Sequence, residues 1–142
     1  MTVLIDTNVV IRHLTQEPAD QGQAASRFLA DCQSLWLTDV IAAEVVYVLQ
    51  SVYRAPRETI ATALRALLAM RSVVVERGSV LLRGIELYER EHLDFTDAYL
   101  VAFAEANGGA QIASFDQGIE KTVRKVSAVR TVNPLTGTVA GG

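Results

Sequence analysis

Four acidic residues stand among apolar residues, where an ionised side chain is hard to accommodate. Asp6 lies between the apolar runs VLI and VVI, and Glu44 is the only charged residue in the stretch IAAEVVYVL. Asp97 opens the apolar segment AYLVAFA, and Asp116 follows IASF. A carboxylate in such surroundings is costly unless a cation, a cluster of hydrogen-bond donors or a metal ion compensates its charge. These four acids are therefore the first candidates for chemistry.

A divalent metal ion is the partner that best fits four converging acids. Asp6 and Asp116 each follow a predicted strand, and ligands of open parallel sheets bind at the carboxyl ends of the strands. Glu44 and Asp97, on predicted helices, can lean into the same crevice. Carboxylates gathered there repel one another, and Mg²⁺ or Mn²⁺, which prefer oxygen ligands, would relieve that repulsion. The pattern therefore favours metal-dependent chemistry.

Each acid also has a purely structural interpretation. Asp6 or Asp116 could cap the helix that follows it, and Asp97 could share the capping of its helix with Thr96. Glu44 could pair with a buried arginine. Because all four structural interpretations would have to hold together, with two of the acids also at strand ends, we favour the metal site.

Strands and helices alternate along the chain, which favours a mostly parallel sheet covered on both faces. Apolar, β-branched runs predict strands at residues 3–5, 35–37, 73–75, 112–113 and 129–132. Helical spacing of apolar residues predicts helices at residues 8–14, 18–31, 40–52, 56–70, 79–91, 97–107 and 117–123. Asp39 and Thr96 are the predicted N-caps of the third and sixth helices. We expect one α/β domain over residues 1–134 and a flexible tail over residues 135–142.

Composition narrows the class of protein. Half of the 142 residues are apolar and a fifth are charged, which is typical of a globular domain. The single cysteine, Cys32, cannot form an internal disulfide, no apolar run approaches the ~18 residues that span a bilayer, and the N-terminus lacks a signal-peptide pattern. We therefore expect a soluble, cytoplasmic protein. The net charge of −3 does not exclude a nucleic-acid partner, because it approaches balance once four acids belong to a metal site.

Three segments of the chain resemble the signature of PIN domains, and most closely that of VapC-type toxins of bacterial toxin–antitoxin pairs. They are LIDTNVVI at the start, AAEVVYVL in the middle and DFTDAYLVAFAEANGGAQIASFDQGIEK near the end. The likeness covers residues 2–134 in the family's order and approximate spacing. The motif DTN alone is a weak indication of a PIN domain. Its combination with an isolated helical glutamate and with the motifs F-x-D-A and SFD, in this order, is a specific one.

The resemblance implies a three-layer α/β/α sandwich with a central, mostly parallel sheet, and endoribonuclease activity with a Mg²⁺ cofactor that Mn²⁺ can replace. A bound divalent ion supplies hydroxide near neutral pH and offsets charge on the phosphoryl oxygens. The products would be a 5′-phosphate and a 3′-hydroxyl. By resemblance the catalytic acids are Asp6, Glu44, Asp97 and Asp116, with Asp6 and Asp97 as the firmest metal ligands.

Several neighbouring residues receive roles from the same resemblance. Asn8 and Ser114 match the polar residues that orient the carboxylates, although the family often has threonine where Ser114 stands. Asp94 can assist the site, but its position at the start of a helix favours a capping or surface role. Three basic residues after Asp116 could hold RNA phosphates, with a solvated helix face as the alternative: Lys121, Arg124 and Lys125. We expect His13 and His92 at the surface, and Cys32 and Trp36 in packing roles.

The resemblance also implies partners, namely an RNA substrate, a second copy of the chain in a homodimer, and a cognate VapB-type antitoxin. We expect an antitoxin segment to enter the acidic crevice with a basic side chain, and we expect no membrane partner. Two other functions are considered. A non-catalytic PIN-like module that binds RNA or protein is disfavoured because all four acids are present. A related DNA nuclease would be separated by comparing RNA with DNA as substrate.

Overall fold

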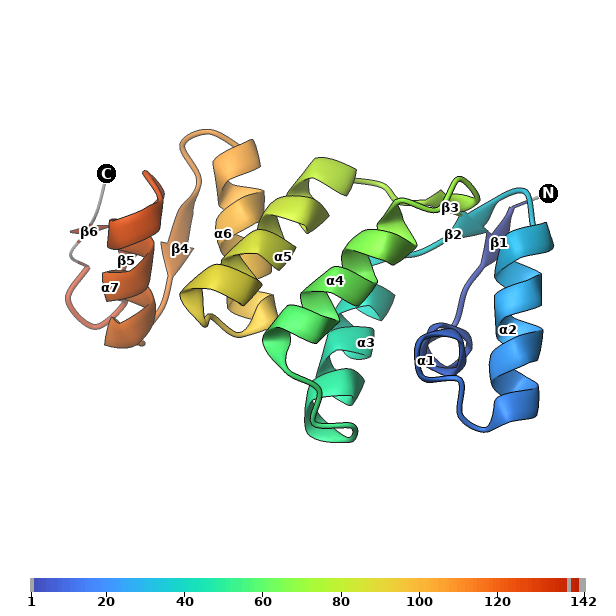
Figure 1. Ribbon diagram of the computed structural model, residues 1–142. Coiled ribbons are helices and arrows are strands. Elements are labelled where there is room, and N and C mark those ends of the chain that lie inside the picture. Colours follow the sequence, from blue (N-terminus) through green and yellow to red (C-terminus); the bar gives the residue numbers. More distant parts are fainter. Residues whose placement is uncertain (1, 138, 141–142) are drawn as a thin grey trace. The chain divides into compact units, whose positions relative to one another are not determined.

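The structure is a computed structural model that describes residues 2–137 and 139–140. The chain divides into two compact units, Met1–Gly78 and Ser79–Gly142. The described residues form seven helices and six strands (Figure 1). Within them, no helix combines the length and the apolar character needed to cross a membrane.

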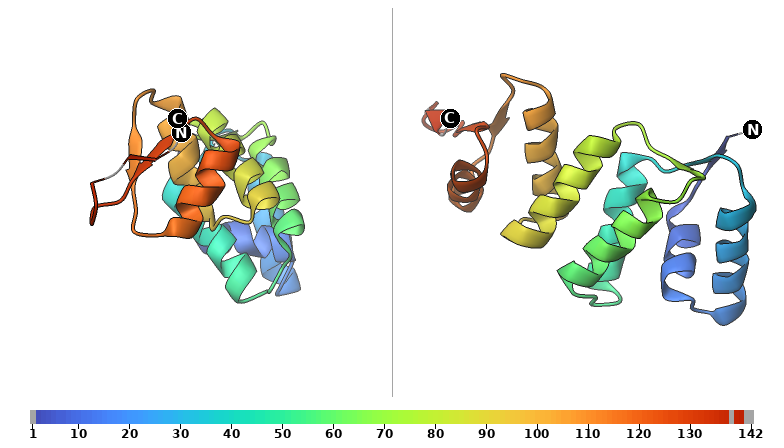
Figure 2. Two further views of the ribbon diagram at one scale, coloured as in Figure 1. Left: turned by 90° about the vertical axis from the view of Figure 1, so that its left-hand side faces the viewer. Right: turned by 45° about the horizontal axis from the view of Figure 1, so that its top comes forward.

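The first unit contains a three-stranded parallel sheet and four helices. The strands are β1 (Val3–Leu4), β2 (Leu35–Trp36) and β3 (Val73–Val74), in the order β1-β2-β3. The helices are α1 (Thr7–Thr15), α2 (Ala19–Asp31), α3 (Asp39–Ser51) and α4 (Arg57–Leu68). Helices α1 and α2 lie side by side, joined by a short turn (Figure 2). Because parallel strands need crossover connections, these helices lie between successive strands of the chain.

The core of the first unit is built from the apolar faces of these helices and from the middle strand. Strand β2 contributes Leu35, which is fully buried, and Leu37 directly after the strand is buried too. Helices α1, α2 and α4 add their buried apolar residues, among them Val10, Leu29 and Ile60. The helical spacing of such residues is what predicted the helices from the sequence.

The second unit contains three helices and three strands. They are α5 (Gly78–Glu91), α6 (Phe95–Ala106), β4 (Gln111–Ala113), α7 (Gln117–Val126), β5 (Arg130–Val132) and β6 (Val139–Ala140). Strands β4 and β5 are parallel, and β5 and β6 are antiparallel. The rings of Tyr88 and Phe95 pack edge to face with centroids 6.0 Å apart. A Cβ atom at Gly84 of α5 would lie 3.5 Å from the Cα atom of Tyr99, so α5 and α6 approach closely there.

One ion-pair network ties the helices of the second unit together. The Arg83 guanidinium donates to Glu105 at 2.8 Å and to Glu86 at 2.8 Å, and it also reaches the Val126 carbonyl. The Ser127 hydroxyl donates to Glu105 at 2.8 Å. These hydrogen bonds, with the positive charge of Arg83, lower the pKa of Glu105 below its ordinary value. The network connects α5, α6 and the end of α7.

The predicted α/β class and the parallel pairing of strands are confirmed, and all predicted helices and strands are present within a few residues of their predicted bounds. Two predicted caps are wrong. Thr38, rather than Asp39, caps α3, because its hydroxyl accepts a hydrogen bond from the Ile41 amide at 3.3 Å. Thr96 lies inside the first turn of α6, and Asp94 occupies the N-cap position.

Strand β6 lies in the segment predicted to be a flexible tail. Thr131 and Val132 of β5 pair with Ala140 and Val139 of β6. Residues 138, 141 and 142 of that segment fall outside the described residues, so the tail as a whole stays a prediction.

Candidate functional site

Two of the four predicted acids lie together in the first unit, connected by Thr7. Asp6 is the N-cap of α1, and its Oδ1 atom accepts a hydrogen bond from the Thr7 amide at 2.9 Å. The Thr7 hydroxyl donates to Oε2 of Glu44 on α3, also at 2.9 Å. Thr7 is only 6% exposed, whereas both carboxylates are exposed. One buried threonine thus holds two exposed acids in the same neighbourhood.

The carboxyl edge of the first sheet positions Asp6, as predicted, and α3, which carries Glu44, begins at the same edge. The backbone pairing continues beyond the strands, with Ile5 N donating to Trp36 O at 3.1 Å and Leu37 N donating to Val74 O at 3.0 Å. Asp6 and Thr38 follow directly and begin α1 and α3. Because the strands are parallel, both helices start at the same edge.

Thr7 is a functional candidate that the sequence analysis missed. The available signal was its place in the middle of the DTN motif, between two residues that were assigned roles. Asn8, the predicted orienting residue, is exposed on the first turn of α1 and lines a groove of about 460 Å³ between α1 and α2. In this structure the hydroxyl that reaches Glu44 belongs to Thr7. The role of Asn8 stays a prediction.

The other two predicted acids lie together in the second unit, with Asp94 as a third. Asp97 is half-buried in the first turn of α6. Burial raises the pKa of its carboxyl above the ordinary value, and the negative charges of Asp94 and Asp116 raise it further. Two neighbouring carboxylates therefore disfavour the ionised form of Asp97. A nearby cation would favour it.

Asp116 is fixed by the start of α7. Its Oδ1 atom accepts hydrogen bonds from Gly118 N at 2.7 Å and Ile119 N at 3.3 Å, and its own amide donates to the Ser114 hydroxyl at 3.0 Å. The Ser114 amide in turn donates to Val132 O at 3.0 Å, which extends the β4–β5 pairing. Ser114 thus positions the backbone of Asp116, the acid that follows it by two residues.

A small cavity of about 120 Å³ opens beside Asp97. Its lining is otherwise apolar or weakly polar and consists of Leu100, Ile112, Ala113, Ser114 and Ile119. This volume exceeds the about 30 Å³ that one water molecule takes up in the liquid, so the cavity has room for water. Among the described residues that line the cavity, Asp97 is the only charged one.

The structure shows a purely structural role for some of the four acids and not for others. Asp6 and Asp116 do cap α1 and α7. The hydrogen-bond partner of Glu44 is the Thr7 hydroxyl rather than a buried arginine. Asp97 sits in the first turn of α6, where the helix dipole favours an acid. Across the described part of the chain, no three His, Cys, Asp or Glu side chains form a ligand group for one metal ion.

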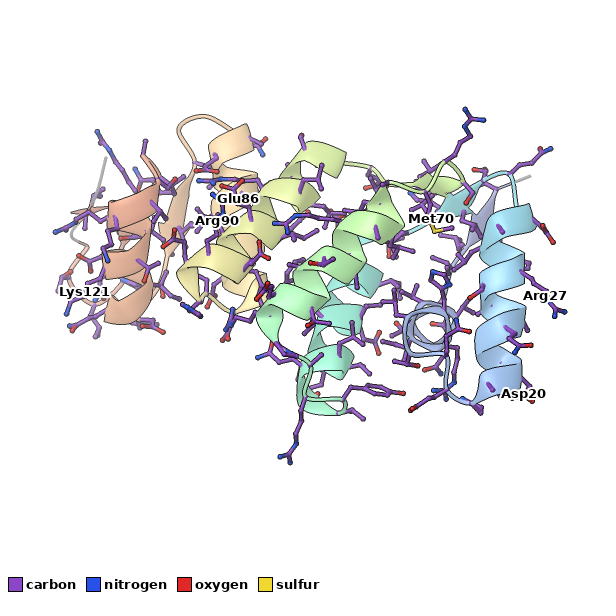
Figure 3. All side chains as sticks on the ribbon, viewed as in Figure 1. Asp20, Arg27, Met70, Glu86, Arg90 and Lys121 are labelled. Carbon is purple, nitrogen blue, oxygen red and sulfur yellow. The ribbon has the colours of Figure 1, made fainter. Side chains whose placement is uncertain are left out.

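The basic residues after Asp116 lie on α7. Lys121, Arg124 and Lys125 are exposed, and Lys121 projects away from the ribbon (Figure 3). Arg124 pairs with Glu120 at 3.2 Å, one helical turn away. That pair offsets part of the positive charge of this face.

His13 and His92 were both expected at the surface, and the structure buries His13 more deeply than His92. His13 is half-buried, and its Nδ1 atom lies 2.8 Å from the Ser26 hydroxyl oxygen. Burial lowers the pKa of His13 below its ordinary value. His92 is exposed. Cys32 and Trp36 are half-buried, in line with the packing roles predicted for them.

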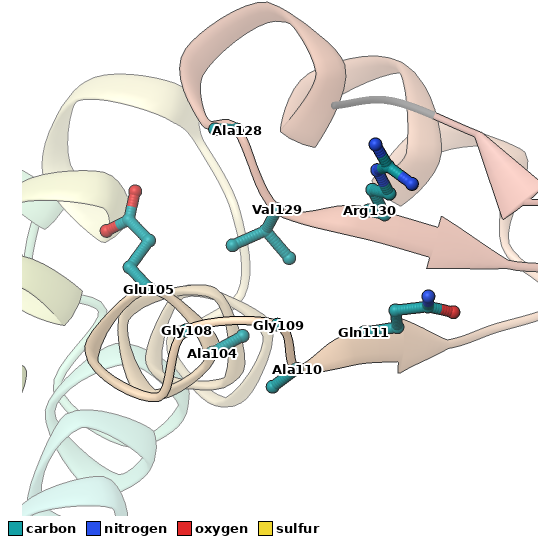
Figure 4. A pocket seen from close by; sticks show the side chains of 9 residues that line it. All are labelled: Ala104, Glu105, Gly108, Gly109, Ala110, Gln111, Ala128, Val129 and Arg130. Atoms are coloured by element: carbon teal, nitrogen blue, oxygen red, sulfur yellow. The ribbon is translucent and has the colours of Figure 1, made fainter.

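A larger groove of about 580 Å³ lies at the other end of β4 and contains none of the predicted acids (Figure 4). Its charged residues are Glu105 and Arg130. The Glu105 carboxylate is already engaged by Arg83 and Ser127. Figure 4 shows Gln111 and Arg130 beside each other on the paired strands β4 and β5. The acids, rather than this groove, are the candidate site.

Comparison with known proteins gives one family. The sequence pattern that defines the PIN domain matches residues 3–125, which includes all four predicted acids and parts of both units. None of the curated proteins compared with the chain matches it. PIN domains are typically nucleases that act on nucleic acids, and they generally use divalent metal ions. The chain belongs to the PIN domain family.

Proposed function

We propose that this protein is a Mg²⁺-dependent endoribonuclease and the toxin of a VapBC-type toxin–antitoxin pair, acting in the cytoplasm. The observation that supports it most strongly is the environment of Asp97. Its half-buried carboxyl has a raised pKa because of burial and because Asp94 and Asp116 are close. A divalent cation relieves both effects. PIN domains as a class act on nucleic acids.

The donor set suits Mg²⁺ or Mn²⁺. Mg²⁺ usually keeps several of its waters and is held by only one or two carboxylates, so a group of three protein ligands is not required. The cavity beside Asp97, about 120 Å³, has room for some of those waters. We propose Asp6 and Asp97 as the metal ligands and Glu44 and Asp116 as the other two catalytic acids, because all four match the motifs of the family.

The residues around these acids keep them in place for the reaction. A bound divalent ion supplies a water of lowered pKa and offsets charge on the phosphoryl oxygens. Thr7 holds the Glu44 carboxylate by one hydrogen bond. The amides of Gly118 and Ile119 hold Oδ1 of Asp116. Fixed carboxylates need little rearrangement when the substrate binds, which is the general advantage of a preorganised site.

We further propose the partners of this activity. RNA is the substrate, and the exposed Lys121, Arg124 and Lys125 contact its phosphates. The protein forms a homodimer. A cognate antitoxin of the VapB type inhibits it by placing a basic side chain against the acids, whose negative charges in the second unit already raise the pKa of Asp97.

The test is cleavage of RNA by purified protein, free of any antitoxin, in Mg²⁺ or Mn²⁺. We expect the wild-type protein to cut RNA and the Asp6→Asn variant to do so about a thousandfold more slowly or worse. The matched control is Asp20→Asn, the same change at an exposed acid of α2, which should leave the rate unchanged. Equal rates for wild type and Asp6→Asn, or no cleavage by either, would refute the proposal.

Two further measurements separate the alternative functions. A non-catalytic binding module would show no cleavage and no Mg²⁺ uptake in calorimetry, whereas the proposed nuclease takes up Mg²⁺ in a manner that depends on Asp97. A DNA nuclease would cut single-stranded DNA at least as fast as RNA of the same sequence.

A further inference from the structure

Phe115 is an aromatic side chain left in solvent beside the acids of the second unit. It is 66% exposed, whereas Phe95 of the same unit is 6% exposed and packs on Tyr88. A single exposed apolar residue is common on protein surfaces. The position of Phe115 is what sets it apart, because it stands between Ser114 and Asp116, two residues of the candidate site.

The backbone on both sides of Phe115 is fixed. The amide of Ser114 donates to Val132 O at 3.0 Å, and the amide of Asp116 donates to the Ser114 hydroxyl at 3.0 Å. Oδ1 of Asp116 accepts from the Gly118 amide at 2.7 Å. The ring is therefore presented from a rigid turn, so that little backbone entropy would be lost when a ligand contacts it.

The acids beside Phe115 cannot by themselves attract a nucleic acid. The chain carries a formal net charge of −3, and Arg124, one of three exposed bases on α7, is paired with Glu120. Aromatic rings bind nucleobases by stacking, which does not depend on positive charge. Phe115 offers such a ring at one residue from Asp116, whose charge acts on Asp97.

We propose that Phe115 is a positioning residue that stacks on a nucleobase of the RNA next to the bond that is cut. The stack holds the neighbouring phosphodiester at Asp97 and Asp116 and supplies attraction that the acidic surface lacks. This inference rests on the proposed ribonuclease function and adds to it the residue that places the substrate.

The first test compares four variants in RNA cleavage. Phe115→Ala should lower kcat/KM by about 5-fold to 140-fold, mainly through a higher KM, which is the range that loss of one stacked base predicts. Phe115→Trp should stay close to wild type, because it keeps a flat aromatic face. Phe115→Leu, which keeps apolar volume without that face, should resemble Phe115→Ala. The matched control is Phe28→Ala, at a 46% exposed phenylalanine whose groove is lined by no acid.

Abasic RNA separates stacking from a structural role of Phe115. Single abasic nucleotides are placed in turn on each side of the mapped cleavage site. At the stacked position, the abasic change should weaken wild-type cleavage as much as Phe115→Ala does, and the two changes together should cost no more than either alone. If the loss of activity from Phe115→Ala and the loss from the abasic nucleotide multiply at every position tested, the proposal is wrong.

A fluorescence measurement tests the contact without relying on cleavage. The chain has a single tryptophan, Trp36, so Phe115→Trp in a Trp36→Phe background places the only indole beside Asp116. Addition of a short single-stranded RNA, with chelator present, should quench this emission, whereas Phe28→Trp in the same background should not respond. If RNA binds by anisotropy but the emission at position 115 is unchanged, the proposal is wrong. If the wild-type protein cuts no RNA, the proposed ribonuclease function is wrong, but the fluorescence result still decides whether Phe115 stacks on RNA. If the protein does not bind RNA at all, both proposals are wrong.

Discussion

Asp6 and Glu44 in the first unit are held by hydrogen bonds from one residue, Thr7, whereas Asp97 in the second unit faces the negative charges of Asp94 and Asp116. In the first case a neutral donor brings two exposed carboxylates together. In the second, a half-buried carboxylate has two like-charged neighbours, which together with burial raise its pKa. The comparison indicates that a neighbouring hydroxyl and amide position the acids of the first unit, whereas like charges act on Asp97 in the second. Of the two groups, Asp97 would gain more from a nearby cation.

The largest expected effect is that of Asp97→Asn. We expect RNA cleavage to fall about a thousandfold or more, because a metal ligand is neutralised. In chelator, the same variant should unfold at a higher temperature than wild type, because burial and two acidic neighbours disfavour the charged form of Asp97 at neutral pH. Cleavage rates and thermal melts in EDTA measure the two effects. A variant that melts at a lower temperature than wild type would contradict the proposed repulsion.

Added Mg²⁺ should stabilise the wild-type protein in a manner that depends on Asp97. An ion present at 100 times its dissociation constant adds about 2.7 kcal/mol to the free energy of unfolding. We expect the thermal midpoint to rise with Mg²⁺ in wild type and in Thr7→Val, but not in Asp97→Asn. If the thermal midpoint of Thr7→Val, like that of Asp97→Asn, did not rise with Mg²⁺, the difference that we infer between Thr7 and Asp97 would be wrong.

Thr7→Val tests the hydrogen-bonded positioning in the first unit. The change removes the hydroxyl that reaches Glu44 and keeps the shape of the side chain. We expect cleavage to fall about 10-fold to 100-fold, the usual effect of losing a residue that orients a ligand or catalytic carboxylate. Thr7→Ser restores the hydroxyl and should recover most of the rate. Similar RNA cleavage rates for Thr7→Val and Thr7→Ser would show that the hydrogen bond to Glu44 does not contribute to catalysis.

The smallest expected effect concerns pH and has opposite signs in the two units. Burial lowers the pKa of His13 in the folded first unit, so the unfolded chain binds more protons just below the ordinary value of 6.5. Stability should therefore fall as the pH decreases from neutral through this range, and His13→Gln should flatten the dependence. Asp97, with its raised pKa, should add stability as the pH falls through its folded pKa toward the ordinary value of 3.8 in metal-free protein. Urea unfolding from neutral pH down to about pH 4 measures both effects.

Much of the fold followed from local sequence patterns, and the same patterns led to the four acids that we propose. The helical spacing of apolar residues located the helices, because a helix that packs on a core needs a continuous apolar face. The choice between Thr38 and Asp39 as the cap of α3 was not predictable, because both residue types cap well and only side-chain geometry decides.

The features that were missed depend on contacts between distant parts of the chain. The role of Thr7 requires α3 to lie against α1, and the burial of His13 requires α2 to bring Ser26 to it. Strand β6 consists of Val139–Ala140 in a segment of small residues, and pairing with β5 is what orders it. Such contacts arise from packing, which the spacing of residues within one helix or strand does not encode.

The cap that Asp116 forms on α7 has a consequence for how the protein matures. The amides at a helix start carry partial positive charge, so those of Gly118 and Ile119 offset part of the Asp116 charge before any ion arrives. The second unit can therefore gather its acids as the chain folds. We expect the newly made polypeptide to complete its fold in the absence of magnesium and to acquire the ion afterwards.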